Sequence, residues 1–312
     1  MGALAVAGTL AAPAPQLTVQ SHERLLVVAP HPDDETLGAG GLIQRVLARG
    51  GTARVVLVTA GDGYVEAVVH ETGHPRPRPG EYFAYGERRL REARLALRVL
   101  GGDGIGDEHL LGFPDGGLES LLQRRWKHSD PERSPTTGAT EAPYAEAEDP
   151  GARYDRADLR AALIRCLRDV RPTTIALPDP LDRHPDHHAM GLFSLLAVND
   201  WVHEKPASRR AMPRLLAYLV HWPDWPPGWN TQTPSADTAQ ARLELPAALH
   251  AQGPAAPLLT LTDAEVARKG AALAEYATQQ QAMASLLTAF VRRTEPFRLV
   301  TMADVFSRRP RE

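Results

Sequence analysis

The feature that most constrains this chain is an apolar run that ends abruptly in charge. Residues Leu25–Ala29 are all apolar, which is typical of a strand buried on both faces. One imidazole and three carboxylates follow within five residues, those of His31, Asp33, Asp34 and Glu35. Burying so much charge costs free energy unless a cation compensates it. Since ligands of open α/β sheets bind at the carboxyl ends of strands, the run predicts a divalent metal at a strand end.

A second cluster, rich in histidine, follows another predicted strand. Residues 174–177 are typical of a strand, and the sequence HPDHH comes soon after it at residues 184–188. His184 is three residues from His187 and four from His188, so either pair shares a face if this segment opens a helix. Two such clusters after two strands indicate one metal site divided between two strand ends.

The composition narrows both the ligand chemistry and the classes of partner. With a single cysteine, Cys166, the chain can form neither an internal disulfide nor a thiolate metal cage, so the metal ligands must be nitrogen and oxygen atoms. Cys166 itself is expected to be a buried, inert thiol. The net charge of -3 gives no reason to expect a nucleic acid partner. Outside the N-terminus no apolar run of about 18 residues occurs, so no internal membrane span is expected. The sequence carries no signature of an oligomeric state.

The N-terminus differs in composition from the rest of the chain. Residues 1–16 are mostly small and apolar, like the apolar core of an export signal, but no Lys or Arg precedes them. We expect residues 1–22 to be a flexible segment, the remnant of a signal or an anchor. This expectation favours an extracytoplasmic or membrane-anchored protein over a cytoplasmic one.

Strand and helix patterns alternate along the chain, which predicts an α/β fold with a mostly parallel sheet and helices on both faces. We expect residues 23–312 to form a single domain. Two long irregular segments, 126–155 and 222–235, are predicted to be surface excursions. Residues 64–82 are rich in Pro, Gly and Arg and predict a loop. The predicted strands are 25–29, 54–59, 108–113, 174–177, 215–221 and 295–300, and the predicted helices are 37–49, 85–100, 158–169, 190–202 and 262–290.

The two clusters suit a zinc site with three His or Asp ligands and one position left open to water. His31 and Asp34 would supply two ligands, and a histidine of the second cluster would supply the third. Adjacent carboxylates do not easily reach the same ion, so of Asp33 and Asp34 one is expected to bind the metal and the other to act as a general base. The same nitrogen and oxygen ligands also suit iron(II), cobalt or manganese. Glu35 is expected to be structural, bonded to backbone groups of the metal loop.

The sequence PHPDDE at residues 30–35, followed much later by HPDH at 184–187, resembles the zinc-dependent de-N-acetylase family of LmbE-like and PIG-L-like proteins. Residues 111–116 (LGFPDG) resemble the loop after that family's third strand. The resemblance covers roughly residues 24–300 and implies a Rossmann-like α/β fold of the LmbE-like hydrolase type. Further matches are Arg89, Glu92 and Ala93 on the helix after the second strand, and Lys269, Tyr276 and Gln279 on the C-terminal helix.

The resemblance also implies an activity and a role for each candidate residue. Members of the family remove the acetyl group from N-acetylglucosamine linked to various aglycones, so the implied substrate is a small-molecule or glycoconjugate N-acetyl amino sugar. One Zn²⁺ per chain is the implied cofactor. The implied roles are His31, Asp34 and His187 as zinc ligands, Asp33 as general base, His184 as the group that stabilises the oxyanion or protonates the leaving amine, Asp186 as the residue that orients His184, and Arg89 and Asp115 as sugar contacts.

Two other functions are consistent with parts of the sequence. Residues 38–41 (GAGG) follow a strand, as phosphate-binding glycine loops do, but the spacing is not GxGxxG and the acidic cluster before them would repel a pyrophosphate. A non-catalytic carbohydrate-binding protein would keep the metal but would have no need of Asp33 beside it. Trp222, Trp225 and Trp229 are expected to pack the second excursion onto the domain rather than to stack on sugar rings. Because either excursion can wall the pocket, the sequence leaves the aglycone open.

Overall fold

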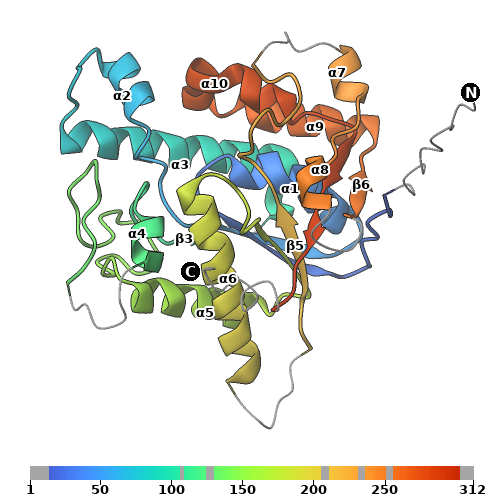
Figure 1. Cartoon of the computed structure of the whole chain (residues 1–312), viewed down its shortest axis with the longest axis horizontal. Helices are drawn as coiled ribbons and strands as arrows, with labels where there is room; N and C mark the ends of the chain where they lie inside the picture. Colours follow the sequence, from blue (N-terminus) through green and yellow to red (C-terminus); the bar gives the residue numbers. More distant parts are fainter. Residues whose placement is uncertain are drawn as a thin grey trace, which may run out of the picture.

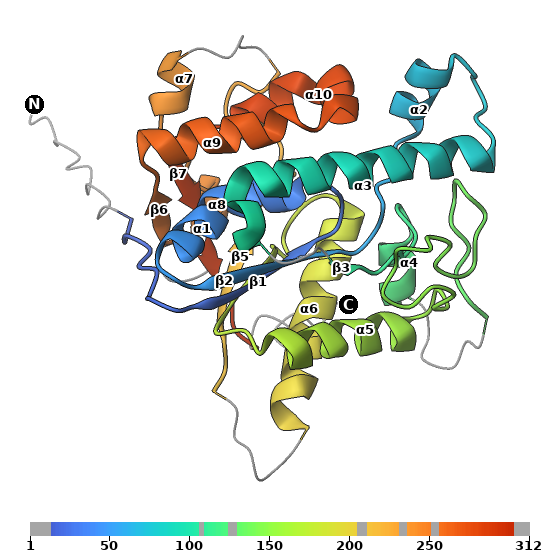
Figure 2. The ribbon, with the colours of Figure 1, turned by 180° about the vertical axis from the view of Figure 1, so that it is seen from behind.

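The fold is built around a six-stranded, mostly parallel sheet (Figures 1 and 2). The structure is a computed structural model that describes residues 14–105, 109–123, 130–204, 211–230, 236–250 and 256–302. The strand order is β3-β2-β1-β4-β5-β8, with all neighbours parallel except the edge strand β8, which is antiparallel to β5. The strands are β1 (Arg24–Ala29), β2 (Thr52–Leu57), β3 (His109–Leu110), β4 (Thr174–Pro178), β5 (Arg214–Tyr218) and β8 (Arg298–Leu299); β6 (Leu258–Thr260) and β7 (Thr294–Pro296) form a separate antiparallel pair.

Helices cover both faces of this sheet, which confirms the predicted α/β class. In both views α1, α3, α9 and α10 lie together above the sheet, and α5 and α6 lie below it (Figures 1 and 2). The helices are α1 (Asp34–Ala48), α2 (Val65–Thr72), α3 (Pro79–Gly101), α4 (Leu118–Gln123), α5 (Arg156–Val170), α6 (Pro185–His203), α7 (Ala236–Gln240), α8 (Ala247–His250), α9 (Asp263–Ala274) and α10 (Ala277–Ala289), and residues Gly102–Gly104 form a 3-10 turn.

The two central strands bring the two histidine clusters to the same edge of the sheet. All of β4, and all of β1 after Arg24, is buried, as expected of parallel strands covered on both faces. The two strands pair in parallel, with Leu25 opposite Thr174 and Val27 opposite Ala176. Both chains therefore leave the sheet at neighbouring points of its carboxyl edge.

Two helices start earlier in the structure than the sequence predicts, and an additional helix precedes one of them. The predicted loop 64–82 contains α2 and the first turn of α3. Pro79 begins α3 without cost because the N–H that proline lacks has no intrahelical partner at that position. Likewise α6 begins at Pro185 rather than at residue 190. In both places a proline that suggests a loop is the first residue of a helix.

In the C-terminal region, one predicted helix and one predicted strand are each split into two elements. Thr262 does cap α9, because its hydroxyl accepts a hydrogen bond from the Glu265 N–H at 3.2 Å. However, the predicted helix 262–290 is interrupted at Tyr276, whose side chain is fully buried, and α10 begins after it. The predicted strand 295–300 is shared between β7 and β8, which belong to different sheets.

The first excursion, 126–155, is irregular throughout its described part, which starts at residue 130. Its Glu148 N–H donates to the Leu110 carbonyl of β3 at 2.8 Å. The Glu148 side chain contacts His109 and accepts a hydrogen bond from the buried Cys166 thiol at 3.6 Å. Burial raises the pKa of Cys166 to about 12, which agrees with the expectation of an inert thiol.

The second excursion packs onto the domain through one of its tryptophans. Trp225 is buried, its ring meets Phe290 edge-on with centroids 5.2 Å apart, and its indole N–H donates to the Glu244 carbonyl at 2.8 Å. This confirms the packing role for Trp225. Residues 231–235 of this excursion lie outside the described residues.

The N-terminal segment is described only from residue 14 onward. Residues 1–13, most of the signal-like stretch, lie outside the described residues. Leu17 and Val19 pack on the domain: both are buried, and the Leu17 N–H donates to the Leu258 carbonyl at 2.8 Å. Among the described helices, none has the length and apolar character needed to cross a membrane.

Candidate metal centre

The three predicted metal ligands meet at the carboxyl edge of β1 and β4. His31 lies in the turn after β1, Asp34 is the first residue of α1, and His187 lies in the first turn of α6. The Asp34 Oδ2 atom is 3.1 Å from Nε2 of His187 and 3.2 Å from Nδ1 of His31. All three residues are buried, and each offers a ligand atom within 4.8 Å of the other two. The structure thus brings together the residues that the sequence predicts.

The chemistry of this group fits a divalent metal. Neither ring nitrogen of His187 makes a hydrogen bond of good geometry, although Nε2 faces Asp34 and Nδ1 lies 3.4 Å from Asp182 Oδ2. Burial alone would lower the pKa of His187, but the two carboxylates raise it to about 10. The site therefore stabilises positive charge at its centre. Two imidazoles and one carboxylate are a donor set that zinc accepts, with a further position left for water or substrate.

A second possible ligand group, His31 with His184 and Asp186, shares one residue with the first. In this second group the Asp186 carboxylate already accepts backbone hydrogen bonds on both oxygens, from the Gly116 N–H at 2.7 Å and the Leu118 N–H at 3.0 Å. Its oxygens are therefore less available to an ion than those of Asp34. The geometry favours the first group.

Asp33 lies beside the ligands but points to a different partner. Its Oδ2 atom is 3.1 Å from a guanidinium nitrogen of Arg89. Burial raises the pKa of the Asp33 carboxyl to about 8; the Arg89 charge opposes this rise, and the Asp34 and Glu35 charges add to it. A carboxylate with a raised pKa near a metal site is suited to take up a proton near neutral pH.

Arg89 is buried rather than exposed on the helix surface. Its guanidinium donates to the carbonyls of Gly61 at 2.8 Å and Pro32 at 2.7 Å as well as to Asp33. The two carbonyls belong to the loops that follow β1 and β2. Arg89 therefore links these two loops to each other and to Asp33, the candidate general base.

Asp115, the other predicted sugar contact, also lies in the cluster. Its Oδ2 atom accepts a hydrogen bond from the Gly63 N–H at 2.6 Å, and its Oδ1 atom is 3.1 Å from Nε2 of His31. Burial alone would raise the pKa of Asp115, but the charge and hydrogen bond of His31, together with the charge of Arg89, lower this pKa below its usual value. Asp115 is thus placed as a charged neighbour of the candidate ligand His31.

His184 lies at the N-cap of α6, next to the ligand rings. Its centroid is 5.0 Å from that of His31 and 5.1 Å from that of His187. Burial, followed by the charges of these two histidines, lowers the pKa of His184, which keeps the ring neutral. Its Nδ1 atom accepts a hydrogen bond from the backbone N–H of Asp186 at 3.3 Å. This contact comes from the backbone of Asp186, whereas the Asp186 carboxylate holds the loop before α4. That Asp186 orients His184 stays a prediction.

Two residues that lie in this site, His221 and Asp182, were not identified from the sequence. The His221 ring lies 4.7 Å from His187 and 4.9 Å from His184, centroid to centroid. Asp182 faces His187 and accepts hydrogen bonds from the N–H groups of Val220 and His221 at 2.9 and 3.0 Å. His221 is a single histidine at the end of the predicted strand 215–221, so only the knowledge that β5 is next to β4 could have pointed to it.

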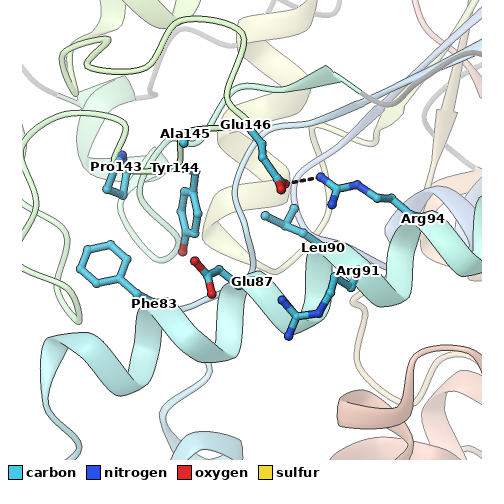
Figure 3. Close-up of a pocket in the computed structure, with 9 residues that line it drawn as sticks. All are labelled: Phe83, Glu87, Leu90, Arg91, Arg94, Pro143, Tyr144, Ala145 and Glu146. Carbon is cyan, nitrogen blue, oxygen red and sulfur yellow. Dashed lines mark hydrogen bonds and ion pairs between the residues drawn. The ribbon is translucent and has the colours of Figure 1, made fainter.

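A separate cleft of about 440 Å³ lies between α3 and the first excursion (Figure 3). None of its lining residues is a candidate ligand or general base. Tyr144 connects the two regions, because its hydroxyl donates to the buried Asp62 carboxylate in the loop after β2 at 2.5 Å. The cleft is lined by Phe83, Glu87, Leu90, Arg91, Arg94, Pro143, Tyr144, Ala145 and Glu146.

Comparison with known proteins identifies relatives on the same part of the chain. A deacetylase of Saccharopolyspora erythraea named for 1D-myo-inositol 2-acetamido-2-deoxy-alpha-D-glucopyranoside is 32% identical over 166 residues, which cover 53% of this chain and 52% of that protein. Diacetylchitobiose deacetylase of Thermococcus kodakarensis is 26% identical over 181 residues, covering 57% of this chain and 49% of that protein. The chain thus spans about half the length of these curated relatives.

A solved structure shows the same fold over nearly the whole chain. The crystal structure of a conserved protein of Thermus thermophilus superposes with a TM-score of 0.53 and 23% identity, covering 89% of this chain and 95% of that one. The family model described as PIG-L, GlcNAc-PI de-N-acetylase, matches residues 26–198, a segment that includes both histidine clusters and more than half of the chain. The protein therefore belongs to the PIG-L family.

Proposed function

We propose that this protein is a metal-dependent hydrolase that removes the acetyl group from an N-acetylglucosamine-type sugar or glycoconjugate. The observation that carries the proposal is the Asp33 carboxylate beside the converging ligand atoms of His31, Asp34 and His187. The curated relatives are named as deacetylases of amino sugars, which supports the same reaction class. The products would be acetate and the free amine.

His31, Asp34 and His187 would hold one Zn²⁺ per chain, although the same donors accept other divalent transition metals. When bound, zinc supplies Lewis-acid polarisation of the acetamide carbonyl and lowers the pKa of water from its bulk value to about 7. Asp182 faces the outer nitrogen of His187, as carboxylates behind metal-binding histidines commonly do.

Asp33 acts as the general base. It takes the proton from the water that attacks the acetamide carbonyl, and burial, which raises the pKa of this carboxyl, favours that proton uptake. Arg89 holds the carboxylate through the 3.1 Å ion pair. Since the guanidinium donates to three protein oxygens, we assign Arg89 to positioning Asp33 rather than to contacting the sugar.

His184, which follows β4 at the N-cap of α6, serves the later steps of the reaction. The neutral ring can donate a hydrogen bond to the developing oxyanion, which is a large part of catalysis in amide hydrolysis. The leaving amine receives its proton from Asp33 or from His184. Asp115, close to His31, is the residue that we assign to the sugar hydroxyls.

The test is free-amine release from a panel of N-acetylglucosamine compounds by zinc-loaded protein. The panel runs from the monosaccharide and chitobiose to glycolipids and thiol-linked glycosides. We expect release from at least one compound, and we expect Asp33→Asn to keep its zinc while turnover falls by about 10²- to 10⁴-fold. A fully active Asp33→Asn variant contradicts the assigned base. Zinc binding without release from any compound favours a carbohydrate-binding protein on the same scaffold.

A further inference from the structure

We infer that Glu35 and Tyr276 form a positioning pair that holds the Asp33 carboxylate in its working orientation. The inference rests on the proposed function, because it assumes that Asp33 is the general base. Neither residue is a candidate ligand, and neither is placed in contact with the reacting atoms. Their effect on the reaction would pass through the backbone of Asp33.

The starting observation is the backbone conformation of Asp33. Its φ angle is 123° and its ψ angle is −30°, a combination that residues with a side chain rarely adopt. Such conformations persist at functional sites only where surrounding contacts impose them. The Asp33 carbonyl accepts hydrogen bonds from the N–H groups of Thr36 at 3.0 Å and Leu37 at 2.9 Å, which fixes one side of the residue to the start of α1.

Glu35 fixes the other side of Asp33. Its Oε2 atom accepts a hydrogen bond from the Asp33 N–H at 3.1 Å. The Glu35 side chain is 0% exposed, and among the described residues it forms no ion pair. Its Oε1 atom instead accepts hydrogen bonds from two hydroxyls, those of Thr36 at 2.7 Å and of Tyr276. A buried carboxylate without a cation needs such donors to keep its orientation.

Tyr276 comes from a distant part of the chain. It lies where the predicted helix 262–290 is interrupted between α9 and α10, and its side chain is also 0% exposed. Its hydroxyl is within hydrogen-bond distance of both Glu35 and Thr36. The interruption therefore supplies the donor that holds Glu35, and Glu35 in turn holds the Asp33 backbone.

The contacts of this pair point to turnover rather than to metal binding. They converge on Asp33 and do not reach His31 or His187 in the described contacts. The predicted signature is a fall in kcat with unchanged KM and unchanged metal content. A residue that only stabilises the fold would change the unfolding midpoint without this kinetic pattern.

The experiment compares Tyr276→Phe with a matched control in the full-length, zinc-loaded protein. The substitution removes one hydroxyl and keeps the ring volume. We expect kcat to fall by about 10- to 100-fold, as for other outer-shell partners of an active site, with KM and zinc stoichiometry unchanged. The control is Tyr154→Phe, which removes a buried hydroxyl that donates to the Gly112 carbonyl at 3.0 Å, and its kcat should match the wild type.

Two substitutions of Glu35 supply the rescue test. Glu35→Gln keeps an oxygen that can accept from the Asp33 N–H, whereas Glu35→Leu does not. We expect the Gln variant to retain clearly more activity than the Leu variant. Equal kcat in Tyr276→Phe and the wild type, or equal loss in both Glu35 variants, overturns the inference.

Crystal structures separate this outcome from a failure of the proposed function. If the wild type releases no amine from the panel, the proposed function fails. The inference can still be tested, because the conformation of Asp33 can be compared between crystals of the two variants. The positive φ angle and the Asp33–Arg89 ion pair should be lost in Tyr276→Phe and kept in Tyr154→Phe. An unchanged Asp33 in the Tyr276→Phe crystal contradicts the role of the pair.

Discussion

Helix α3 carries two arginines whose surroundings differ on its two faces. Arg89 is 4% exposed, and its guanidinium donates to two backbone carbonyls and to Asp33 in the candidate metal centre. Arg94 lines the cleft on the other side of the helix and pairs with Glu146, whose side chain is 60% exposed (Figure 3). The same residue type thus organises a buried site on one face and makes a solvated ion pair on the other.

The candidate metal centre and the cleft differ in the same way as the two faces of α3, since one is buried and the other is partly solvated. In the candidate metal centre, charged groups are buried and each has several partners, so removing one leaves others without compensation. In the cleft, the charges of Arg94 and Glu146 are partly solvated, and water can replace a lost partner. Substitutions should therefore have large effects in the centre and small effects in the cleft.

The largest effect is expected for His187→Ala. This variant removes a ligand atom from the centre, so metal affinity should fall by more than the roughly 10- to 100-fold loss typical of an outer-shell partner. Metal content after dialysis and titration calorimetry measure the loss. The neighbour His188, whose Nδ1 atom lies 2.6 Å from the Pro180 carbonyl, supplies the control, and His188→Ala should keep its metal. Equal affinities in the two variants would show that the second ligand group, with His184 and Asp186, holds the metal instead.

An intermediate effect is expected for Arg89→Met. Removing the guanidinium leaves the Asp33 carboxylate buried without its cation, which should lower the free energy of unfolding by about 3–5 kcal/mol. Urea denaturation measures this change. Arg89→Lys keeps the charge but not the planar fork that reaches three oxygens, so it should fall between the wild type and the Met variant. If the Met variant were as stable as the wild type, the expectation that substitutions on the buried face of α3 have the larger effects would be wrong.

The smallest effect is expected for Arg94→Ala in the cleft. An exposed ion pair contributes about 0–1 kcal/mol, so unfolding should change by no more than this amount. Amine release from a monosaccharide substrate should match the wild type. A selective loss of activity on substrates with long aglycones would instead make the cleft part of the binding surface, and the two regions would then act together.

Much of the centre was predictable because its signals are local in sequence. Asp33 and Asp34 are neighbours after an apolar run, and His184 and His187 are three residues apart, so their chemistry is visible without any fold. The structure brings His31, Asp34 and His187 together as predicted. The alternation of strand and helix likewise predicted the parallel sheet, since both periodicities depend on neighbouring residues.

Other parts were not predictable because they depend on contacts between distant segments. The interruption of the helix at Tyr276 is accompanied by a hydrogen bond to a carboxylate 241 residues away, which helical periodicity does not report. The first turns of α3 and α6, which begin at Pro79 and Pro185, were missed because proline suggests a loop when its neighbours are not known.

The sequence by itself determined which groups can bind a metal and act as a base, since ligand chemistry belongs to residue types and their spacing. Only the tertiary structure decided how these groups are held. The pairing of β4 with β5 places His221 and Asp182 at the centre, and the packing of α3 against the strand-end loops buries Arg89 under Asp33. Both arrangements come from burying apolar strands and helices against one another, and the polar side chains take the positions that this packing leaves them.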